Sequence, residues 1–181
     1  MTTRLSLPDK VLALDRALDA IPHAFGGALA LAYYAEPRAT VDIDLNVFVP
    51  ETESADTIEP LATLGIHADR RSLAAAQNEG QVRLRWDDTP VDLFFSYDPF
   101  HDAAAAKVRR VPFASATIPI LAAEHLAVCK VVFDRPKDWV DIAAMREAGT
   151  DLDAVEILRW VQRIVGDDDE RYAHIVTLLT S

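Results

Sequence analysis

Apolar and polar positions follow strand and helix patterns in the front part of the chain and helical patterns alone in the remainder. Between residues 41 and 49, apolar side chains occupy every odd position, which is the two-residue period of a strand with one buried face. Further β-type runs predict strands at 23–25, 81–86, 90–96 and 110–117. The connection Asp87-Asp88-Thr89 indicates that the runs 81–86 and 90–96 form a hairpin.

Helical patterns lie between and after these strands. A helix is expected to begin at Ser6, with Pro8 in its first turn. An alanine- and leucine-rich segment predicts a buried helix at 28–35, and residues 52–64 predict a helix that Gly65 closes. Pro136, Gly149 and Gly166 separate four further expected helices, at about 121–133, 136–148, 151–165 and 168–179.

This order of elements predicts an α/β (α+β) fold: a mixed β-sheet with flanking helices over residues 1–118, followed by a C-terminal helical bundle over 119–181. A chain of 181 residues, 50% of them hydrophobic, is long and apolar enough to bury a full core.

The net charge and the cysteine content indicate which partners and which cellular compartment to expect. The net charge of -11 argues against non-specific binding of DNA or RNA, because clustered Lys and Arg side chains hold phosphate backbones. Basic residues such as Arg83 and Arg85 occur in the middle of the chain, and solvated surface is the simpler interpretation of most of them. The single cysteine, Cys129, excludes an internal disulfide, and no apolar run reaches membrane-spanning length. We therefore expect a cytoplasmic protein without a membrane partner.

Three aspartates are the strongest candidates for chemistry. Asp42 and Asp44 leave the strand at 41–49 on the same side, where two carboxylates repel each other by roughly 1 to 3 kcal/mol. A divalent cation would compensate this charge. Asp92 lies in a strongly apolar run, and if its strand is adjacent, the three carboxylates can hold one or two Mg²⁺ (or Mn²⁺) ions. The alternative for each aspartate is a position on the solvated face of an amphipathic strand.

A pair of glycines, Gly26 and Gly27, precedes these acids. Without side chains, their backbone N–H groups can approach phosphate oxygens, and the start of the following helix attracts anions. The alternative is a tight connection between a strand and a helix.

The stretch from Phe25-Gly26-Gly27 through Arg38-Ala39-Thr40 to Asp42-Ile43-Asp44 resembles the opening motif of the polymerase-β-type nucleotidyltransferase superfamily. Within it, the stretch is similar to the AbiEii/AbiGii-type branch of toxin-like nucleotidyltransferases, which includes the MenT toxins. A second block at 130–142 resembles the helical motif of that branch. The family often has Ser or Thr at or after the second glycine, whereas this chain has Ala28, which leaves the phosphate grip to backbone amides.

The resemblance implies a role for each matching residue. Asp42 and Asp44 would coordinate Mg²⁺ on the nucleotide phosphates, and Asp92 would bind a second metal ion or help to deprotonate the acceptor. Lys130 would neutralise triphosphate charge. The remaining nucleotide-binding residues that the resemblance implies are Gly26, Gly27, Arg38, Arg135, Asp138 and Asp141, the last two orienting Lys130 or the base and ribose. The alternative for the second block is a helix start capped by Asp134 with surface ion pairs.

The function implied is Mg²⁺-dependent transfer of a nucleoside monophosphate from an NTP to RNA, such as a tRNA, by a toxin with a cognate antitoxin. Two alternatives stay open: the acceptor is a protein or a small molecule such as an aminoglycoside, or the chain is a catalytically silent nucleotide-binding module. A plain structural protein would bind neither metal nor nucleotide.

Overall fold

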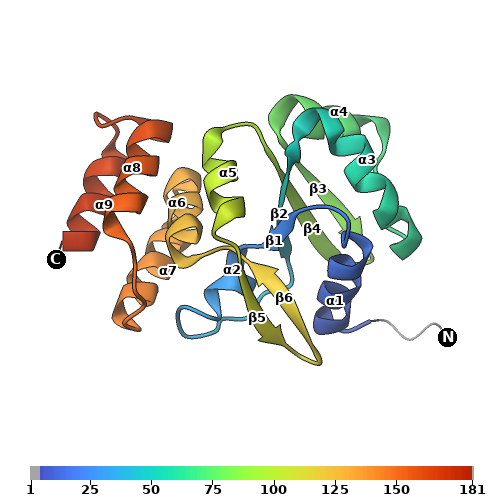
Figure 1. Ribbon diagram of the computed structural model, residues 1–181, viewed down its shortest axis with the longest axis horizontal. Helices are drawn as coiled ribbons and strands as arrows, with labels where there is room; N and C mark the ends of the chain where they lie inside the picture. Colours follow the sequence, from blue (N-terminus) through green and yellow to red (C-terminus); the bar gives the residue numbers. More distant parts are fainter. Residues whose placement is uncertain (1–4, 181) are drawn as a thin grey trace. The chain divides into compact units, whose positions relative to one another are not determined.

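The computed structural model describes residues 5–180 and divides into two compact units (Figure 1). Unit 1 consists of the described residues up to Gly26 together with Ala39–Ile120, and unit 2 of Gly27–Arg38 together with the described residues from Leu121 onward. The boundary near residue 120 lies close to the division expected at 118/119. Residues 27–38, however, group with the C-terminal helices, which the order of elements along the sequence does not indicate.

The strands of unit 1 form one mixed six-stranded sheet in the order β3-β4-β2-β1-β6-β5. Their bounds are His23–Phe25 (β1), Ile43–Pro50 (β2), Gln81–Trp86 (β3), Thr89–Ser96 (β4), Arg109–Phe113 (β5) and Ala116–Ile120 (β6). β2 is parallel to β4, and β1 is parallel to β6. The other neighbouring pairs are antiparallel. The predicted mixed sheet is therefore confirmed.

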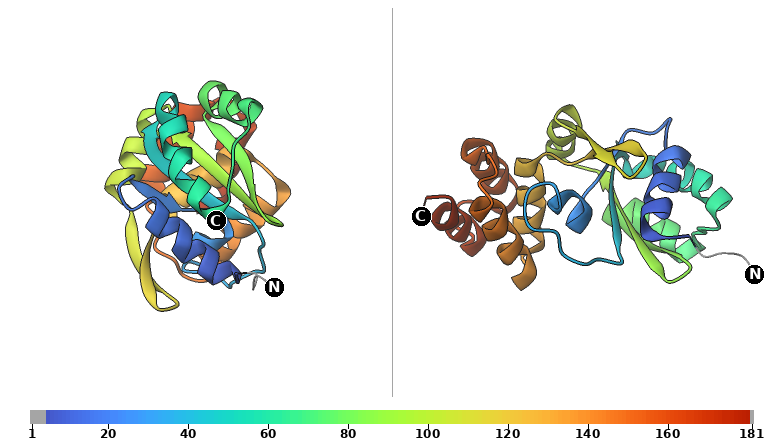
Figure 2. Two further views of the ribbon diagram at one scale, coloured as in Figure 1. Left: turned by 90° about the vertical axis from the view of Figure 1, so that its right-hand side faces the viewer. Right: turned by 90° about the horizontal axis from the view of Figure 1, so that it is seen from below.

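Helices cover both faces of this sheet (Figures 1 and 2). Unit 1 contains α1 (Leu7–Ala17), α3 (Ser54–Ile58), α4 (Arg70–Glu79) and α5 (Pro99–Ala106), with 3-10 turns η1 (Glu51–Glu53) and η2 (Glu59–Leu64). Figure 1 and the right-hand view of Figure 2 place α1, α3 and α4 on one side of the sheet and α5 on the other. Strand alternation explains the core: in β3, Val82, Leu84 and Trp86 are buried, whereas Gln81, Arg83 and Arg85 are exposed.

A buried lysine fixes the turn between β3 and β4. Lys10 of α1 donates hydrogen bonds from Nζ to the Trp86 carbonyl (2.9 Å) and to Thr89 Oγ1 (3.0 Å), and it forms an ion pair with Asp87 (3.2 Å). Asp87 has a φ of 55°, a left-handed conformation that Asp tolerates better than most residues. The turn contains two residues, because Trp86 pairs with Thr89. The expected hairpin is present with a connection one residue shorter than Asp87-Asp88-Thr89.

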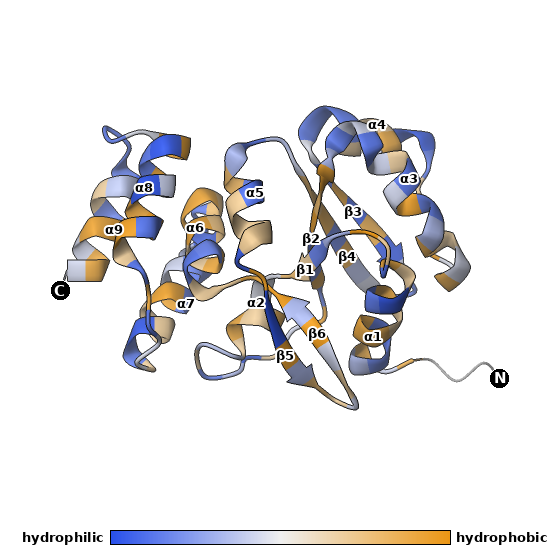
Figure 3. Ribbon diagram, viewed as in Figure 1, coloured by the Kyte–Doolittle hydropathy of each residue, from blue (hydrophilic) through white to orange (hydrophobic). Residues whose placement is uncertain are grey.

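Unit 2 is helical and is organised around α6. Its helices are α2 (Gly27–Leu31), α6 (Ala123–Phe133), α7 (Pro136–Glu147), α8 (Ala154–Val165) and α9 (Glu170–Thr180). Most of α6 is hydrophobic (Figure 3), and it contacts α2, α7, α8 and α9. The four helices predicted in the C-terminal part are confirmed, with ends that differ by a few residues.

Several predicted elements of unit 1 were wrong in type or length. The single strand expected at 110–117 is a hairpin of β5 and β6, because Ala114 adopts a φ of 48° and turns the chain. The single helix expected at 52–64 is a series of short turns around α3, because Pro60 has no N–H group and its ring obstructs a regular helix. It does end at Gly65, whose φ is 81°.

Other elements are shorter than expected or were not predicted. α2 ends at Leu31 instead of continuing to residue 35, and β2 begins at Ile43 instead of residue 41. The apolar pattern did not predict α4 or α5. Both helices begin at an aspartate cap, Asp69 and Asp98, whose side chain accepts a backbone N–H bond. No helix within residues 5–180 is long and apolar enough to cross a lipid bilayer.

Candidate active site

The strand register brings two of the three candidate aspartates together. Asp44 of β2 and Asp92 of β4 are direct partners across the parallel pair, so both side chains leave the same face of the sheet. Asp42 precedes β2, and its backbone N–H is held by Thr40 Oγ1 at 3.2 Å. We call Asp42, Asp44 and Asp92 the acid cluster.

A cation from the neighbouring strand lies within the acid cluster. Arg83 of β3 is the register partner of Asp92 and donates from Nε and Nη2 to its two carboxylate oxygens, at 2.7 and 2.6 Å. Its Nη2 is also 3.7 Å from Asp42 Oδ2. The hydrogen bonds with Asp92 raise the pKa of Arg83, and the charges of Asp42 and Asp44 raise it further. Arg83 is exposed, as the simpler interpretation of most basic residues expects, but its guanidinium lies against the acids.

The donor set of the acid cluster fits Mg²⁺ or Mn²⁺, because both ions prefer carboxylate oxygens. Among residues 5–180, however, no three acidic, histidine or cysteine side chains are arranged around a metal position. Both oxygens of Asp92 instead accept hydrogen bonds from the Arg83 guanidinium. The Arg83 guanidinium thus lies where Asp92 and Asp42 attract positive charge.

The two glycines have different local roles. The Gly26 N–H donates to the Asp44 carbonyl at 2.9 Å, so this amide continues the hydrogen bonding of the sheet. Gly27 has a φ of 53°, which favours glycine, and it starts the five-residue helix α2. Gly26 thus lies in a tight connection between strand β1 and helix α2, as the alternative interpretation expects.

The second group of candidate residues forms an ionic network within unit 2. Lys130 of α6 contacts Asp141 at 2.6 Å and Asp138 at 3.7 Å, both on α7. Arg38 donates two hydrogen bonds to Asp141, each of 3.0 Å. Arg135 donates to both carboxylate oxygens of Asp138, at 2.6 and 3.1 Å. The order of charges is therefore Arg38, Asp141, Lys130, Asp138, Arg135, with alternating sign.

Burial makes the centre of this ionic network different from a surface ion pair. Lys130, Asp138 and Asp141 are 4%, 0% and 4% exposed. Buried charges persist only when they are paired and hydrogen-bonded. Arg38 and Arg135 are partly exposed, with side-chain exposures of 38% and 51%. Two guanidinium groups can therefore reach a ligand while the central lysine stays fixed.

The helix-cap interpretation of residues 134–138 also applies, with one correction. Asp134 is the C-cap of α6 in a left-handed conformation (φ 54°), not the N-cap of α7. The N-cap of α7 is Arg135, whose backbone N–H donates a hydrogen bond to the Asp138 carboxylate at 3.2 Å. Asp138 thus serves the helix start and the ionic network together.

The ionic network predicts a pH effect on stability. Burial opposes ionisation of Asp141, but hydrogen bonds from Arg38 and Lys130 outweigh it and hold the pKa of this carboxyl below its usual range. A depressed folded-state pKa stabilises the fold fully above the unfolded-state value of about 4, and this contribution is lost as the pH falls through the folded-state pKa. In urea denaturation, the stability difference between the wild type and Asp141→Asn should therefore shrink from pH 6 to pH 3.

The exposed Asp151→Asn is the matched control for this titration. Its stability difference from the wild type should change less over the same pH range than that of Asp141→Asn. A wild-type to Asp141→Asn difference that does not change with pH would contradict the assigned ionisation of Asp141.

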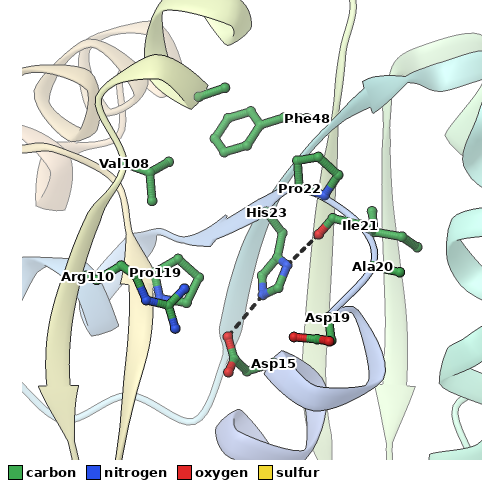
Figure 4. Close-up of a pocket in the computed structure, with 11 residues that line it drawn as sticks. Asp15, Asp19, Ala20, Ile21, Pro22, His23, Phe48, Val108, Arg110 and Pro119 are labelled. Carbon is green, nitrogen blue, oxygen red and sulfur yellow. Dashed lines mark hydrogen bonds and ion pairs between the residues drawn. The ribbon is translucent and has the colours of Figure 1, made fainter.

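Unit 1 also contains an open pocket of about 470 Å³ (Figure 4). Its lining includes Asp15, Asp19, His23, Phe48, Arg110 and Pro119. The ring nitrogens of His23 contact the Ile21 carbonyl (2.8 Å) and Asp15 Oδ1 (3.2 Å). Phe48 follows Asp44 by four residues on β2, about 13 Å along a strand. The lining residues include none of the predicted site residues, so this pocket lies apart from the acid cluster.

The mixed sheet, with Asp44 and Asp92 side by side on parallel strands, is the arrangement that the resemblance to polymerase-β-type nucleotidyltransferases predicts. The chain belongs to the family described as nucleotidyl transferase AbiEii toxin, type IV TA system, which matches residues 11–178. The resemblance inferred from the sequence is therefore confirmed at the level of the family. Comparison with curated proteins gives no match.

Solved structures of antibiotic-modifying enzymes share this fold. The solution structure of the antibiotic-resistance factor ANT(2'')-Ia has a TM-score of 0.55 and 16% identity, covering 93% of this chain and 92% of that one. The crystal structure of ANT(2'')-Ia with adenylyl-2''-tobramycin has a TM-score of 0.55 and 16% identity, covering 94% and 95%. The lincosamide antibiotic adenylyltransferase LnuA, bound to lincomycin, has a TM-score of 0.54 and 13% identity, covering 77% and 94%. At these identities the likeness shows the fold alone.

Proposed function

We propose that the protein transfers a nucleoside monophosphate from an NTP to an RNA acceptor such as a tRNA, with Mg²⁺, as the toxin of a cytoplasmic toxin–antitoxin pair. Membership of the AbiEii family supports the toxin role and the antitoxin partner. The observation that carries the chemistry is the register of Asp44 with Asp92 on one face of the sheet.

The reaction proposed is an in-line displacement at the α-phosphorus of the NTP. A hydroxyl oxygen of the acceptor forms the new bond to phosphorus, the bond to the bridging oxygen breaks, and pyrophosphate leaves with that electron pair. Asp42, Asp44 and Asp92 would hold Mg²⁺, which when bound neutralises phosphate charge and helps to align the reactants. Asp92 would also accept the proton of the acceptor hydroxyl.

The ionic network of unit 2 would bind nucleotide phosphates. Lys130 supplies a buried positive charge, and Asp138 and Asp141 fix its position. Arg38 and Arg135 supply planar guanidinium groups, which match phosphate oxygens in pairs. The network contains three cations and two carboxylates, and its net positive charge favours a polyanionic ligand.

A small-molecule acceptor is the second candidate. Two observations favour it: the chain has a net charge of -11, which is unfavourable for RNA, and solved structures with this fold include ANT(2'')-Ia with adenylyl-2''-tobramycin. A catalytically silent module is the third, favoured by Ala28 in place of a hydroxyl residue.

Incubation with each α-labelled NTP in turn, together with total tRNA, a protein extract or aminoglycosides, separates these candidates. We expect label in tRNA with one or more NTPs in the presence of Mg²⁺, and loss of label when EDTA is added. Label in an aminoglycoside or a protein would replace the RNA proposal. Nucleotide binding by calorimetry without transfer to any acceptor would support the silent module.

A further inference from the structure

Arg83 occupies the acid cluster in a manner that competes with a metal ion. Its Nε and Nη2 atoms bind Oδ1 and Oδ2 of Asp92 at 2.7 and 2.6 Å, and Nη2 lies 3.7 Å from Asp42 Oδ2. The oxygens that would coordinate a divalent cation are therefore the atoms that the guanidinium contacts. Metal coordination by Asp92 and the bidentate contact with Arg83 therefore compete for the same two oxygens, and the two cations also repel each other.

The register of the β3–β4 hairpin places this guanidinium beside the acids. The two-residue turn, held by Lys10, places Arg83 directly opposite Asp92. A turn longer by one residue would place Leu84 there instead. The Arg83 side chain is 60% exposed, so its stem can swing into solvent while the backbone of β3 stays in place.

The charges on this face leave room for a stronger cation. The Arg83 guanidinium lies against two carboxylates, those of Asp92 and Asp42, and carries a single positive charge. A divalent ion supplies twice that charge. Arg85, two positions along the same exposed face of β3, is paired in register with Pro90 and not with an acid.

We propose that Arg83 is the resident counter-ion of the acid cluster, that a divalent metal ion binds by displacing its guanidinium, and that this exchange sets the metal affinity of the site. The proposal rests on the proposed function for the identity of the ion. It assigns Arg83 a role as a positioning residue: without metal it holds Asp92 and Asp42 together, and it yields their oxygens when metal binds.

Titration calorimetry with Mn²⁺ in the absence of nucleotide tests the exchange in the full chain. Arg83→Gln should bind Mn²⁺ about tenfold more tightly than the wild type, because no guanidinium must be displaced from an exposed but bidentate contact. Arg83→Lys, which retains the charge without the two-pronged geometry, should lie between them. Arg85→Gln, which removes the same charge two residues away, should change the affinity less than about twofold, because exposed charges are screened.

Thermal unfolding provides an independent measurement on the same proteins. In EDTA, Arg83→Gln should unfold at a lower temperature than the wild type, because Asp92 and Asp42 lose the guanidinium that lies against them. In saturating Mn²⁺ this difference should disappear. Unchanged or weaker Mn²⁺ binding by Arg83→Gln, or an equal gain in Arg85→Gln, would overturn the exchange.

These outcomes are distinguishable from failure of the proposed function. Nucleotidyl transfer by the wild type together with unchanged Mn²⁺ affinity in Arg83→Gln would reject the exchange and leave the enzyme proposal intact. Tighter Mn²⁺ binding by Arg83→Gln in a protein that transfers nothing would support the exchange and reject the enzyme proposal.

Discussion

Replacing Asp44 with asparagine is expected to lower the rate of nucleotidyl transfer by about a thousandfold or more, equivalent to about 4 kcal/mol of transition-state stabilisation. Asp44 lies on a rigid strand directly beside Asp92, and asparagine preserves its shape while removing the negative charge. A neutral amide is a poor ligand for Mg²⁺ compared with a carboxylate, so the loss should appear in kcat more than in folding. Single-turnover assays with labelled NTP at saturating Mg²⁺ measure the effect.

The matched control is Asp56→Asn, an exposed aspartate on α3 of the same unit. It makes the same change of charge away from the acid cluster and should retain transfer within about twofold, since the effect of an exposed charge is screened by salt. Both variants should show circular dichroism like that of the wild type. Transfer by Asp44→Asn within tenfold of the wild type would remove Asp44 from the reaction.

The alternation of apolar and polar residues predicted the central strands, because one face of each strand is buried. Ile43, Leu45 and Val47 are at most 1% exposed, and Asp44 between them is not buried, so the alternation in the sequence reflects the two faces of β2. The C-terminal helices were predictable for a related reason. Pro136 and Gly166 lie where those helices begin or end, and such residues interrupt a helical pattern in the sequence itself.

The β5–β6 hairpin shows where local signals fail. Its turn contains Ala114 and Ser115, and Ala114 adopts a left-handed conformation that the sequence does not indicate, because glycine, asparagine or aspartate usually marks such a turn. A continuous strand was therefore the simpler prediction. Pairing between β5 and β6, which is a tertiary effect, determines the conformation of this alanine.

Sequence patterns did not single out Arg83, because its position opposite Asp92 depends on the length of the β3–β4 turn. The connection expected from the sequence, Asp87-Asp88-Thr89, has three residues and would place Leu84 opposite Asp92. The actual turn pairs Trp86 with Thr89, and it thereby brings Arg83 to the acid. The Lys10 side chain that holds this turn comes from α1, far away in the sequence, so no local pattern could reveal it.

Sequence patterns also did not predict that residues 27–38 group with the C-terminal helices. It depends on single polar contacts: Tyr34 donates to the Leu121 carbonyl at 2.8 Å, Thr150 donates to the Tyr34 carbonyl, and Arg38 binds Asp141. Single contacts of this kind leave no repeating pattern of apolar and polar residues in the sequence. Resemblance to a known family could nominate Arg38 and Asp141, but only the structure shows that they bind each other.

Replacing Lys130 with methionine is expected to lower the free energy of unfolding by about 3 kcal/mol, because it leaves two buried carboxylates without their shared cation. Asp138 and Asp141 are 0% and 4% exposed, so water cannot replace the ammonium group. Methionine fills a similar volume, which limits the packing contribution to the loss. Urea denaturation, followed by tryptophan fluorescence, measures the change.

The two neighbouring guanidinium groups allow a test of this explanation. Arg135→Gln removes a partner of Asp138 that is 51% exposed, and it should cost about 1 kcal/mol or less. The double variant Lys130→Met with Asp141→Asn should be more stable than Lys130→Met alone, because it also removes a buried carboxylate that has lost one of its two cationic partners. If the double variant is less stable than the single one by the full cost of Asp141→Asn, the two side chains act independently, and the ionic network is not a coupled unit.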